Sequence, residues 1–420
     1  MLLVTALLAG AALAARATQA STVTLTLWHN YGTEGNAVAT KNLVAAFEKQ
    51  NPGITINVIS QPAANYFALL QTSGLSHTGP DLAVMWTGLF DLKYEKLLTN
   101  LKPYLSAADI AKINGAKWVA PDFDTSKGLL VMPLENQFYM GYYNKALFAK
   151  AGLTGPPRTW TQLYAACTKL KAKGITPIVY GADPQAIQSS PYPWYDMSYL
   201  VAPVLTPEGL QGLYTGKTPW TSPAIVAQVS KWAALPKKGC TNSDVLTKTN
   251  ILGAFEKGQA AMIVDGNWDA ATLQKAMGNK VAPMVPPFSD RPQRGVVQYS
   301  GDGFSLLKDS KHQKEGAAFL KFLLTPQASK IIAAAGLIPD IKGSRSLSSL
   351  TNQMLDFAGK QHLTPYPMLD NVTQGEVVTT GSKQLDDALG GNISALAALK
   401  SLEATLDALP ASRKGPVYSG

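Results

Sequence analysis

Hydrophobic and polar positions near the start of the chain alternate in the way that predicts β-structure. Val23, Leu25 and Leu27 alternate with threonines, which is typical of a strand with one buried face. Apolar positions in residues 43–47 then recur at helical spacing, and a second alternating run occupies residues 54–58. Strand, helix and strand in this order indicate a βαβ unit, so we expect a parallel sheet flanked by helices.

A second junction of the same kind lies near the middle of the chain. Residues 139–143 alternate like a strand, and Asn144 opens a short helix that Gly152 closes. After a Pro-Pro break, Thr159 and Gln162 have the spacing of a capping box at the start of the next helix. The pattern therefore predicts a chain built from repeated α/β segments.

The length and charge of the chain limit the classes of protein to which it can belong. At 420 residues the chain is too long for one ordinary core, so we expect two or three lobes. A hydrophobic content of 46% and a charged content of 15% are typical of a folded globular chain. The net charge is +9, but the lysines are scattered, which favours a solvated surface over a nucleic-acid-binding face.

The first residues resemble an export signal. Residues 2–14 are apolar, small residues follow, and the run is too short to cross a bilayer. The usual basic start is missing, because Arg16 is the first charged residue. We assign residues 1–20 to a signal peptide and expect an exported, soluble protein of the periplasm or cell-surface space. We expect no lipid-anchor cysteine, because none precedes Cys167.

The two cysteines, Cys167 and Cys240, allow a disulfide. An even number of cysteines in an oxidising compartment favours a bridge. Cys167 lies on the apolar side of the helix expected from Trp160. The alternative, two unpaired cysteines of which one is buried, stays open at this point.

Residues 22–339 contain several short segments that are each a weak sign of a protein family. Taken together in their order along the chain, they are a specific sign. They are FEKQNPGITINV, PDLAVMW, YYNKALFAKAGLTGPPRTWTQL, AFEKGQAAMIVDGNW, AAFLKFLLTPQAS and GLIP. In this order they resemble the extracellular solute-binding proteins of sugar ABC importers, the maltose-binding-protein-like group. Beyond residue 339 the match is loose.

That resemblance implies a two-lobed α/β fold in which each lobe holds a mostly parallel sheet flanked by helices, with the ligand in the cleft between the lobes. We assign residues 21–132 and 288–337 to the N-terminal lobe, and residues 133–287 and 338–420 to the C-terminal lobe. The resemblance also implies a monomer that captures a mono- or oligosaccharide outside the cytoplasmic membrane and passes it to the permease subunits. Neither catalysis nor a cofactor is expected.

Aromatic residues in loops after expected strands are candidates for stacking on the sugar. Trp86 and Trp268 both leave short strands into polar loops that contain glycine. The resemblance implies stacking, because an indole plane can cover the C–H-rich face of a pyranose. Trp194 and Tyr195 lie in an aromatic, proline-rich run and are candidates from the second lobe, although one of them could be a core residue.

Polar candidates come from loops at the carboxyl ends of strands, where ligands of such sheets bind, and from the first crossover between lobes, where the resemblance implies a polar ligand contact. They are His29, Asn30, Thr33, Glu34, Glu135, Gln137, Asp265, Asn267 and Asp302. At the crossover the spacing favours Gln137 over Glu135, with hinge hydrogen bonding as the alternative role. The alternative for Asp302 is turn formation. Residues 366–371 could add a further cleft residue.

Other activities lack their motifs. The four histidines fit no metal-binding spacing, and GxSxG, P-loop and GxGxxG motifs are missing. Two alternatives stay open. A secreted glycosidase could use two of the carboxylates near the cleft, which are Glu34, Glu135, Asp265 and Asp302. The same fold could bind a phosphorylated polyol, but that site needs clustered Arg or Lys, and the candidate loops hold few.

Overall fold

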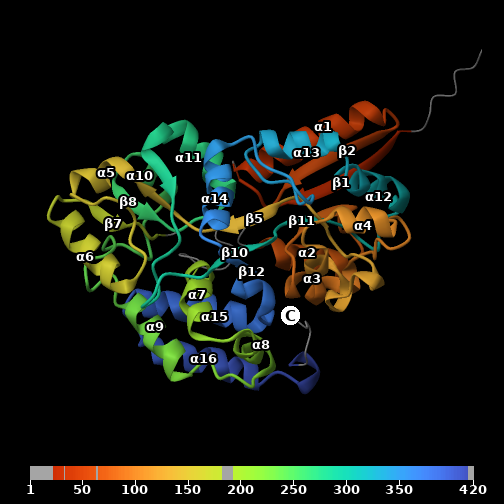
Figure 1. Cartoon of the computed structure of the whole chain (residues 1–420). Helices are drawn as coiled ribbons and strands as arrows, with labels where there is room; N and C mark the ends of the chain where they lie inside the picture. The colour runs from red at the N-terminus through yellow and green to blue at the C-terminus, as the bar shows by residue number, and fades with distance from the viewer. Residues whose placement is uncertain (1–21, 33, 63–64, 182–192, 415–420) are drawn as a thin grey trace, which may run out of the picture.

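The computed structural model describes residues 22–32, 34–62, 65–181 and 193–414. The predicted signal peptide and Thr33 lie outside the described residues. Figure 1 shows two α/β lobes side by side, with a layer of helices beneath them. None of the helices in the described ranges combines the length and the apolar composition that a membrane span requires.

A five-stranded sheet forms the centre of the first lobe, in the order β2-β1-β3-β11-β4. Its strands are β1 (Val23–His29), β2 (Ile54–Ser60), β3 (Leu82–Met85), β4 (Met132–Pro133) and β11 (Gly303–Leu306). β1 pairs in parallel with β2 and β3, which confirms the predicted βαβ unit. β11 pairs antiparallel with β3 and β4.

Helices cover both faces of this sheet. They are α1 (Gly35–Gln50), α2 (Tyr66–Leu75), α3 (Leu89–Tyr94), α4 (Ala107–Lys112), α12 (Gln313–Phe322) and α13 (Pro326–Ala334). The apolar positions expected in residues 43–47 do face the core, since Leu43, Val44 and Phe47 are buried. The ring of Phe47 meets Phe319 and Phe322 of α12 at centroid distances of 5.4 and 5.8 Å. A helix from the later part of the chain thus completes the core around α1.

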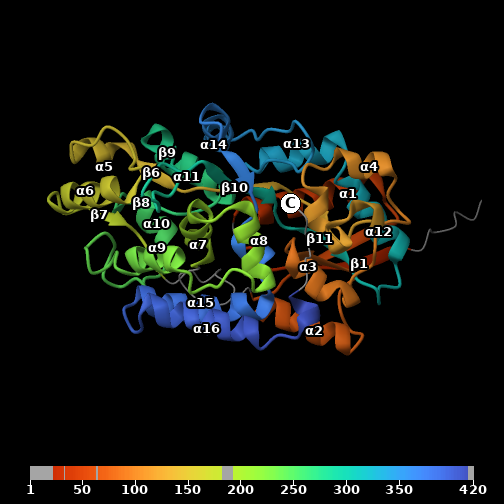
Figure 2. The same cartoon turned by 60° about the horizontal axis from the view of Figure 1, so that its bottom comes forward.

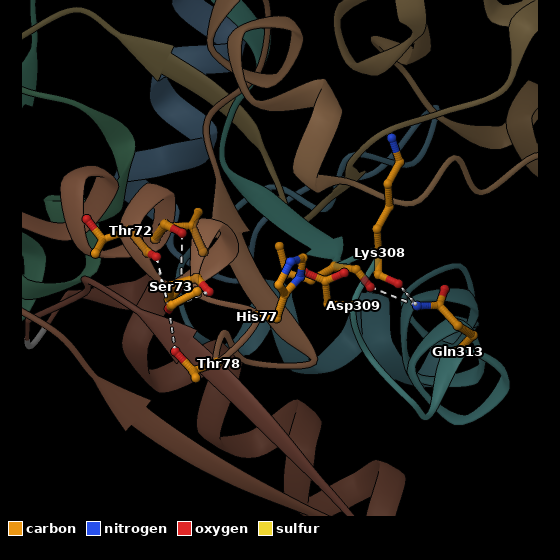
Figure 3. A network of polar contacts seen from close by, with 10 residues as sticks. Thr72, Ser73, His77, Thr78, Lys308, Asp309 and Gln313 are labelled. Atoms are coloured by element: carbon orange, nitrogen blue, oxygen red, sulfur yellow. Dashed lines mark hydrogen bonds and ion pairs between the residues drawn. The ribbon is translucent and has the colours of Figure 1, made fainter.

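A surface contact also ties the two parts of this lobe together. Figure 3 shows the His77 ring, just after α2, facing the Asp309 carboxylate on the turn before α12. Their Nδ1 and Oδ2 atoms are 2.9 Å apart. Gln313 stabilises the same turn by donating to the backbone oxygens of Leu307, Lys308 and Ser310. Because both partners of the ion pair are exposed, it contributes little to stability.

The second lobe is built on a four-stranded sheet in the order β7-β8-β6-β9. Its strands are β6 (Tyr142–Asn144), β7 (Thr176–Ile178), β8 (Ala260–Ile263) and β9 (Val281–Pro283). Its helices are α5 (Lys145–Lys150), α6 (Trp160–Lys171), α10 (Ile251–Glu256), α11 (Ala270–Met277) and α14 (Ser349–Lys360). Thr159 caps α6 as predicted, but the Gln162 side chain accepts from Arg158 N, one residue before the expected donor.

The expectation of mostly parallel sheets needs correction. Only the β1–β2, β1–β3 and β7–β8 pairs are parallel in these two sheets, and the other pairs are antiparallel. One strand in each sheet, β11 in the first and β6 in the second, runs against the other strands, and each follows a passage of the chain from the other lobe. A strand that arrives from the opposite lobe runs against the strands already there, which makes both sheets mixed.

A disulfide joins Cys167 of α6 to Cys240, 73 residues later in the sequence. Both cysteines are buried, and the Cys240 carbonyl accepts a hydrogen bond from Ile178 N in β7. The alternative left open by the sequence, two unpaired cysteines, is therefore excluded in this structure.

Three crossing segments meet between the lobes. A small sheet in the order β12-β10-β5 contains β5 (Asn136–Tyr139), β10 (Gly295–Ser300) and β12 (Thr364–Tyr366). β5 and β10 run antiparallel, so one carries the chain into the second lobe and the other carries it back. The third segment passes beside β5, where Asn136 N donates to Ile338 O at 2.8 Å.

The remaining helices form the layer beneath the lobes, which Figure 2 brings forward. They are α7 (Trp194–Val201), α8 (Pro207–Thr215), α9 (Pro223–Ala233), α15 (Gly375–Leu389) and α16 (Ala395–Asp407). α15 packs on α16, α9 and α7, and it also reaches α3 of the first lobe. The expected amphipathic face of the last helix is buried at Leu399, Leu402 and Leu406.

Candidate functional site

Three aromatic rings from separate parts of the second lobe and its crossover meet in one group, which we call the aromatic cluster: Tyr139, Tyr195 and Trp268. The rings of Tyr139 and Tyr195 are stacked, with centroids 4.0 Å apart and planes 29° apart. The Trp268 ring lies 5.7 Å from Tyr139 and 6.0 Å from Tyr195, tilted to both. Tyr139 is buried, whereas Tyr195 and Trp268 are half-buried and keep part of their rings accessible.

A glycine lets the Trp268 indole take this position. The loop after β8 leads into a 3-10 turn, η7 (Asn267–Asp269), and a Cβ on Gly266 would lie 2.1 Å from an indole carbon of Trp268. The loop is also held by its backbone, because Tyr142 Oη donates to Gly266 O at 2.7 Å and Gly266 N donates to Asp265 Oδ1 at 2.7 Å. The indole is thereby held in place beside the tyrosines.

Trp194 does not belong to this cluster, and the expectation that it faces a ligand is wrong. Its side chain is fully buried, and its indole N–H donates to Val378 O and Ser382 Oγ, both at 3.1 Å. It packs edge-on against Trp220. Successive residues of a helix point about 100° apart, so the first turn of α7 places Tyr195 in the cluster and Trp194 in the core.

Trp86 lies at the carboxyl end of β3 in the first lobe and is half-buried. Its ring packs edge to face with Phe67 and Phe90, with centroids 4.8 and 4.7 Å away. The loop that follows contacts the predicted segment 366–371, because Asn371 Nδ2 donates to Thr87 O at 2.9 Å. Trp86 remains a predicted stacking residue, supported from beneath by two phenylalanines.

A buried carboxyl group connects the two lobes. Glu135 is fully buried, and its carboxylate accepts hydrogen bonds from Asn36 Nδ2 at 2.6 Å, Gln137 Nε2 at 3.1 Å and Asn267 Nδ2 at 3.2 Å. Asn36 belongs to α1 of the first lobe, Asn267 to η7 of the second and Gln137 to the crossover strand β5. We call these four residues the Glu135 node.

Three members of the Glu135 node, Glu135, Gln137 and Asn267, are predicted ligand contacts. In the structure their side chains hydrogen-bond to one another. The remaining polar atom of the Asn267 side chain, Oδ1, accepts from Phe138 N at 2.9 Å. Burial raises the pKa of Glu135 to about 7, and the three amide donors oppose that rise. This geometry favours the alternative role of hinge hydrogen bonding. Sequence reasoning missed Asn36, whose only signal was its position directly after the candidate loop.

Two of the remaining polar candidates, Glu34 and Asp302, lie near each other. Asp302 is half-buried, and its pKa is raised well above the usual value by burial and then by the neighbouring acids Glu135, Glu34 and Asp370. The Glu34 carboxylate accepts from Gly32 N at 3.0 and 2.9 Å. The charges acting on Asp302 are therefore mainly those of other carboxyl groups, and this environment disfavours an anionic ligand.

The first loop adds neutral polar groups to the same region. His29 and Asn30 are half-buried, and burial lowers the pKa of the His29 imidazole. The His29 ring stacks on Tyr31, and its Nδ1 accepts from Tyr31 N at 3.1 Å. The Asn30 side-chain oxygen is buried without a hydrogen-bond partner, so it is available as an acceptor.

In the described part of the chain no group of three or more His, Cys, Asp or Glu residues is arranged to hold a metal ion.

Known proteins resemble this chain in sequence and in fold. The profile of the family described as "Bacterial extracellular solute-binding protein" matches residues 31–330. A binding protein of Brucella abortus (strain 2308) is 24% identical over 371 residues, which cover 87% of this chain and 88% of the relative. The melibiose/raffinose/stachyose-binding protein of Bacillus subtilis (strain 168) is 22% identical over 348 residues, 79% of this chain and 76% of that protein. The solved structure of a chitin oligosaccharide binding protein has the same two-lobed fold, with a TM-score of 0.80 at 22% identity over 92% of this chain and 98% of the other.

Proposed function

Because the chain belongs to the bacterial extracellular solute-binding proteins, we propose that it captures a sugar or oligosaccharide outside the cytoplasmic membrane and delivers it to the permease of an ABC importer. The observation that carries this proposal is the aromatic cluster, in which Tyr195 and Trp268 keep part of their rings accessible beside carboxyl groups. Aromatic faces next to hydrogen-bond acceptors match a pyranose, which has C–H-rich faces and a rim of hydroxyl donors.

The proposed contacts fall into two groups. Tyr195, Trp268 and, from the first lobe, Trp86 stack on sugar rings. The residues that bind hydroxyl groups are His29, Asn30, Thr33, Glu34, Asp265 and Asp302. The Glu135 node, whose amides come from both lobes, aligns the lobes around the ligand.

Oligosaccharides are the ligand class that the relatives support. One is named for melibiose, raffinose and stachyose, and another for chitin oligosaccharides. We propose lobes of residues 21–132 with 288–337 and of 133–287 with 338–420, a monomeric state, and export directed by residues 1–20.

The two alternative functions fit the site less well. A glycosidase needs two carboxyl groups that reach the scissile bond, but the Glu135 carboxylate is fully buried under three amides. A phosphorylated polyol needs basic partners, but the groups that raise the pKa of Asp302 are acids. We therefore propose binding without catalysis.

A panel of neutral mono- and oligosaccharides tests the proposal. A ligand at a hundred times its Kd should stabilise the protein by about 2.7 kcal/mol, which a thermal-shift assay detects, and tryptophan fluorescence should change saturably. Chromatography of the same mixtures after long incubation should show no shorter sugars. If no sugar stabilises the protein, or if shorter products accumulate, the proposed function is wrong.

A further inference from the structure

A short 3-10 turn of the first lobe, η3 (Ala116–Val119), lies against the loop that follows Trp86. The carbonyl oxygen of Trp118 in this turn accepts a hydrogen bond from Gly88 N at 2.7 Å. Gly88 is the second residue after Trp86 and has a left-handed backbone at φ +80°. The backbone at Trp118 is therefore joined directly to the loop that carries the predicted stacking residue of this lobe.

The same part of the chain also packs against the segments that cross between the lobes. Gly115, just before the turn, lies so close to β10 that a Cβ on it would be 2.1 Å from Ser300 Oγ. Asn114 N donates to Asp340 O, on the third crossing segment, at 3.0 Å. Trp118 thus lies where the first lobe meets the crossing segments, beside the loop after β3.

The Trp118 indole is half-buried and contacts two neighbouring side chains. The Phe123 ring packs edge to face with it, with centroids 5.5 Å apart and planes 74° apart. Lys117 Nζ lies 4.7 Å from the ring centroid, but because Lys117 is exposed this cation–π contact is weak, and a stacked sugar ring can displace it. The indole therefore resembles that of Trp86, which is also half-buried and packs edge to face with phenylalanines.

The position of Phe123 depends on an unusual backbone. Asp122 and Phe123 are consecutive residues in the left-handed region, at φ +51° and +56°. That region is unfavourable for residues with a side chain, and most of all for bulky ones. Phe123 N donates to Ala120 O at 3.0 Å, which helps to hold the turn. Strained backbone of this kind is concentrated at ligand-binding and active sites, so this turn indicates a role for the aromatic pair beyond packing.

We propose that Trp118 is a further stacking residue, which forms a second sugar subsite in the first lobe beside that of Trp86. One indole covers about one pyranose ring, so a ligand that uses both indoles contains at least two linked rings. The protein therefore prefers an oligosaccharide to a monosaccharide. This inference rests on the proposed function, because Trp118 stacks on a sugar only if the ligand lies between the lobes.

Homologous sugars of increasing length test the subsite by isothermal titration calorimetry. The probes are the α-1,4-linked and β-1,4-linked glucose series from one to five rings, and the series galactose, melibiose, raffinose and stachyose. For at least one series, affinity should rise with chain length in the unmodified protein. Trp118→Ala should weaken binding of the longest bound member about tenfold and leave the shortest bound member within about twofold.

Two more substitutions at Trp118 separate stacking from general damage, and melting temperatures check that each variant is folded. Trp118→Leu keeps apolar bulk without a flat face, so it should lose affinity as Trp118→Ala does. Trp118→Phe keeps an aromatic face and should retain most of that affinity.

Tyr164→Ala is a matched control elsewhere in the molecule. Tyr164 of α6 is also half-buried, and Lys238 Nζ also lies 4.7 Å from its ring centroid. This variant should bind every sugar within about twofold of the unmodified protein. A loss in Trp118→Ala that is equal at every chain length, or no loss at any length, overturns the subsite alone. If no sugar of the three series binds the unmodified protein, the proposed function fails and the subsite fails with it.

Discussion

Breaking the disulfide between Cys167 and Cys240 should destabilise the protein by several kcal/mol without affecting the sugar site directly. The bridge closes a loop of 73 residues, and the chain-entropy relation for a loop of that length gives about 4 kcal/mol at 25 °C. Strain or residual structure in the unfolded chain would lower this figure, so about 2–4 kcal/mol is expected in a measurement.

Urea unfolding measured by tryptophan fluorescence can isolate this contribution. Trp160 and Trp232 are buried in the part of the second lobe that the bridge braces, so their emission reports its unfolding. The comparison is between the oxidised protein, the same protein under reductant and the double variant Cys167→Ala/Cys240→Ala. Reduction should lower the unfolding free energy of the native chain and leave the double variant unchanged.

Two results would refute this reasoning. Thiol titration of the unfolded, unreduced protein should detect no free thiol, and two free thiols would show that the bridge does not form. A drop of less than about 1 kcal/mol on reduction would show that closing the loop barely restricts the unfolded chain. The double variant should lose somewhat more than reduction removes, because both cysteines are buried and alanine leaves small voids.

Three further substitutions, with a fourth as a core control, test the site and buried polar groups between the lobes. Trp268→Ala should weaken sugar binding by about 1–3 kcal/mol, by analogy with aromatic stacking on bases, with little loss of apo stability, whereas the core control Trp194→Ala should lower stability by about 3–5 kcal/mol; the reverse pattern in melting temperature and affinity would contradict the stacking role. Glu135→Ala should cost about 1–3 kcal/mol, because it leaves buried amides from both lobes unpaired; an unchanged urea midpoint would refute the importance of the node. Asp340 is buried beside the crossing strands, where it accepts hydrogen bonds from Ser300 Oγ of β10 at 2.6 Å and Asn136 Nδ2 of β5 at 3.3 Å. Burial raises its pKa from 3.8 to about 7, so between these values the folded state holds a proton that the unfolded state has released, and the unfolding free energy falls as pH rises through this window. Asp340→Asn should flatten that fall between about pH 4 and 7, and an equally steep profile in the variant would exclude Asp340 as its source.

The local structure was predictable where the pattern of the chain itself determines it. The alternating residues of β1 and β2 and the glycine stop after α5 appear as expected. The antiparallel entry of β11 was not predictable, because it depends on which side the chain returns from. Trp194 and Tyr195 have similar chemistry and adjacent positions, so only the rotation of α7 separates the core residue from the accessible one.

The sequence predicts which loops contribute to the candidate site, but it does not predict which of their side chains contact one another. Tyr139 was missed because a tyrosine within an alternating strand looks like ordinary core. Glu135 was predicted as a possible ligand contact, and its three amide donors come from positions as distant as Asn36 and Asn267. Hydrogen bonds between residues so far apart in sequence leave no local pattern, so their mutual satisfaction becomes visible only in the folded chain.

The place of β11 in the first sheet has a consequence for how the protein folds. β11 lies between β3 and β4, with Leu306 opposite Leu82. During synthesis, β3 must therefore wait for more than half of the chain before its partner β11 exists, and the first sheet cannot be completed until all four strands of the second lobe's sheet have been made. Contacts between residues so distant in sequence slow folding. An exported chain that crosses a membrane unfolded would gain from such a delay, because the topology itself postpones completion of the first sheet until about three-quarters of the polypeptide has been made.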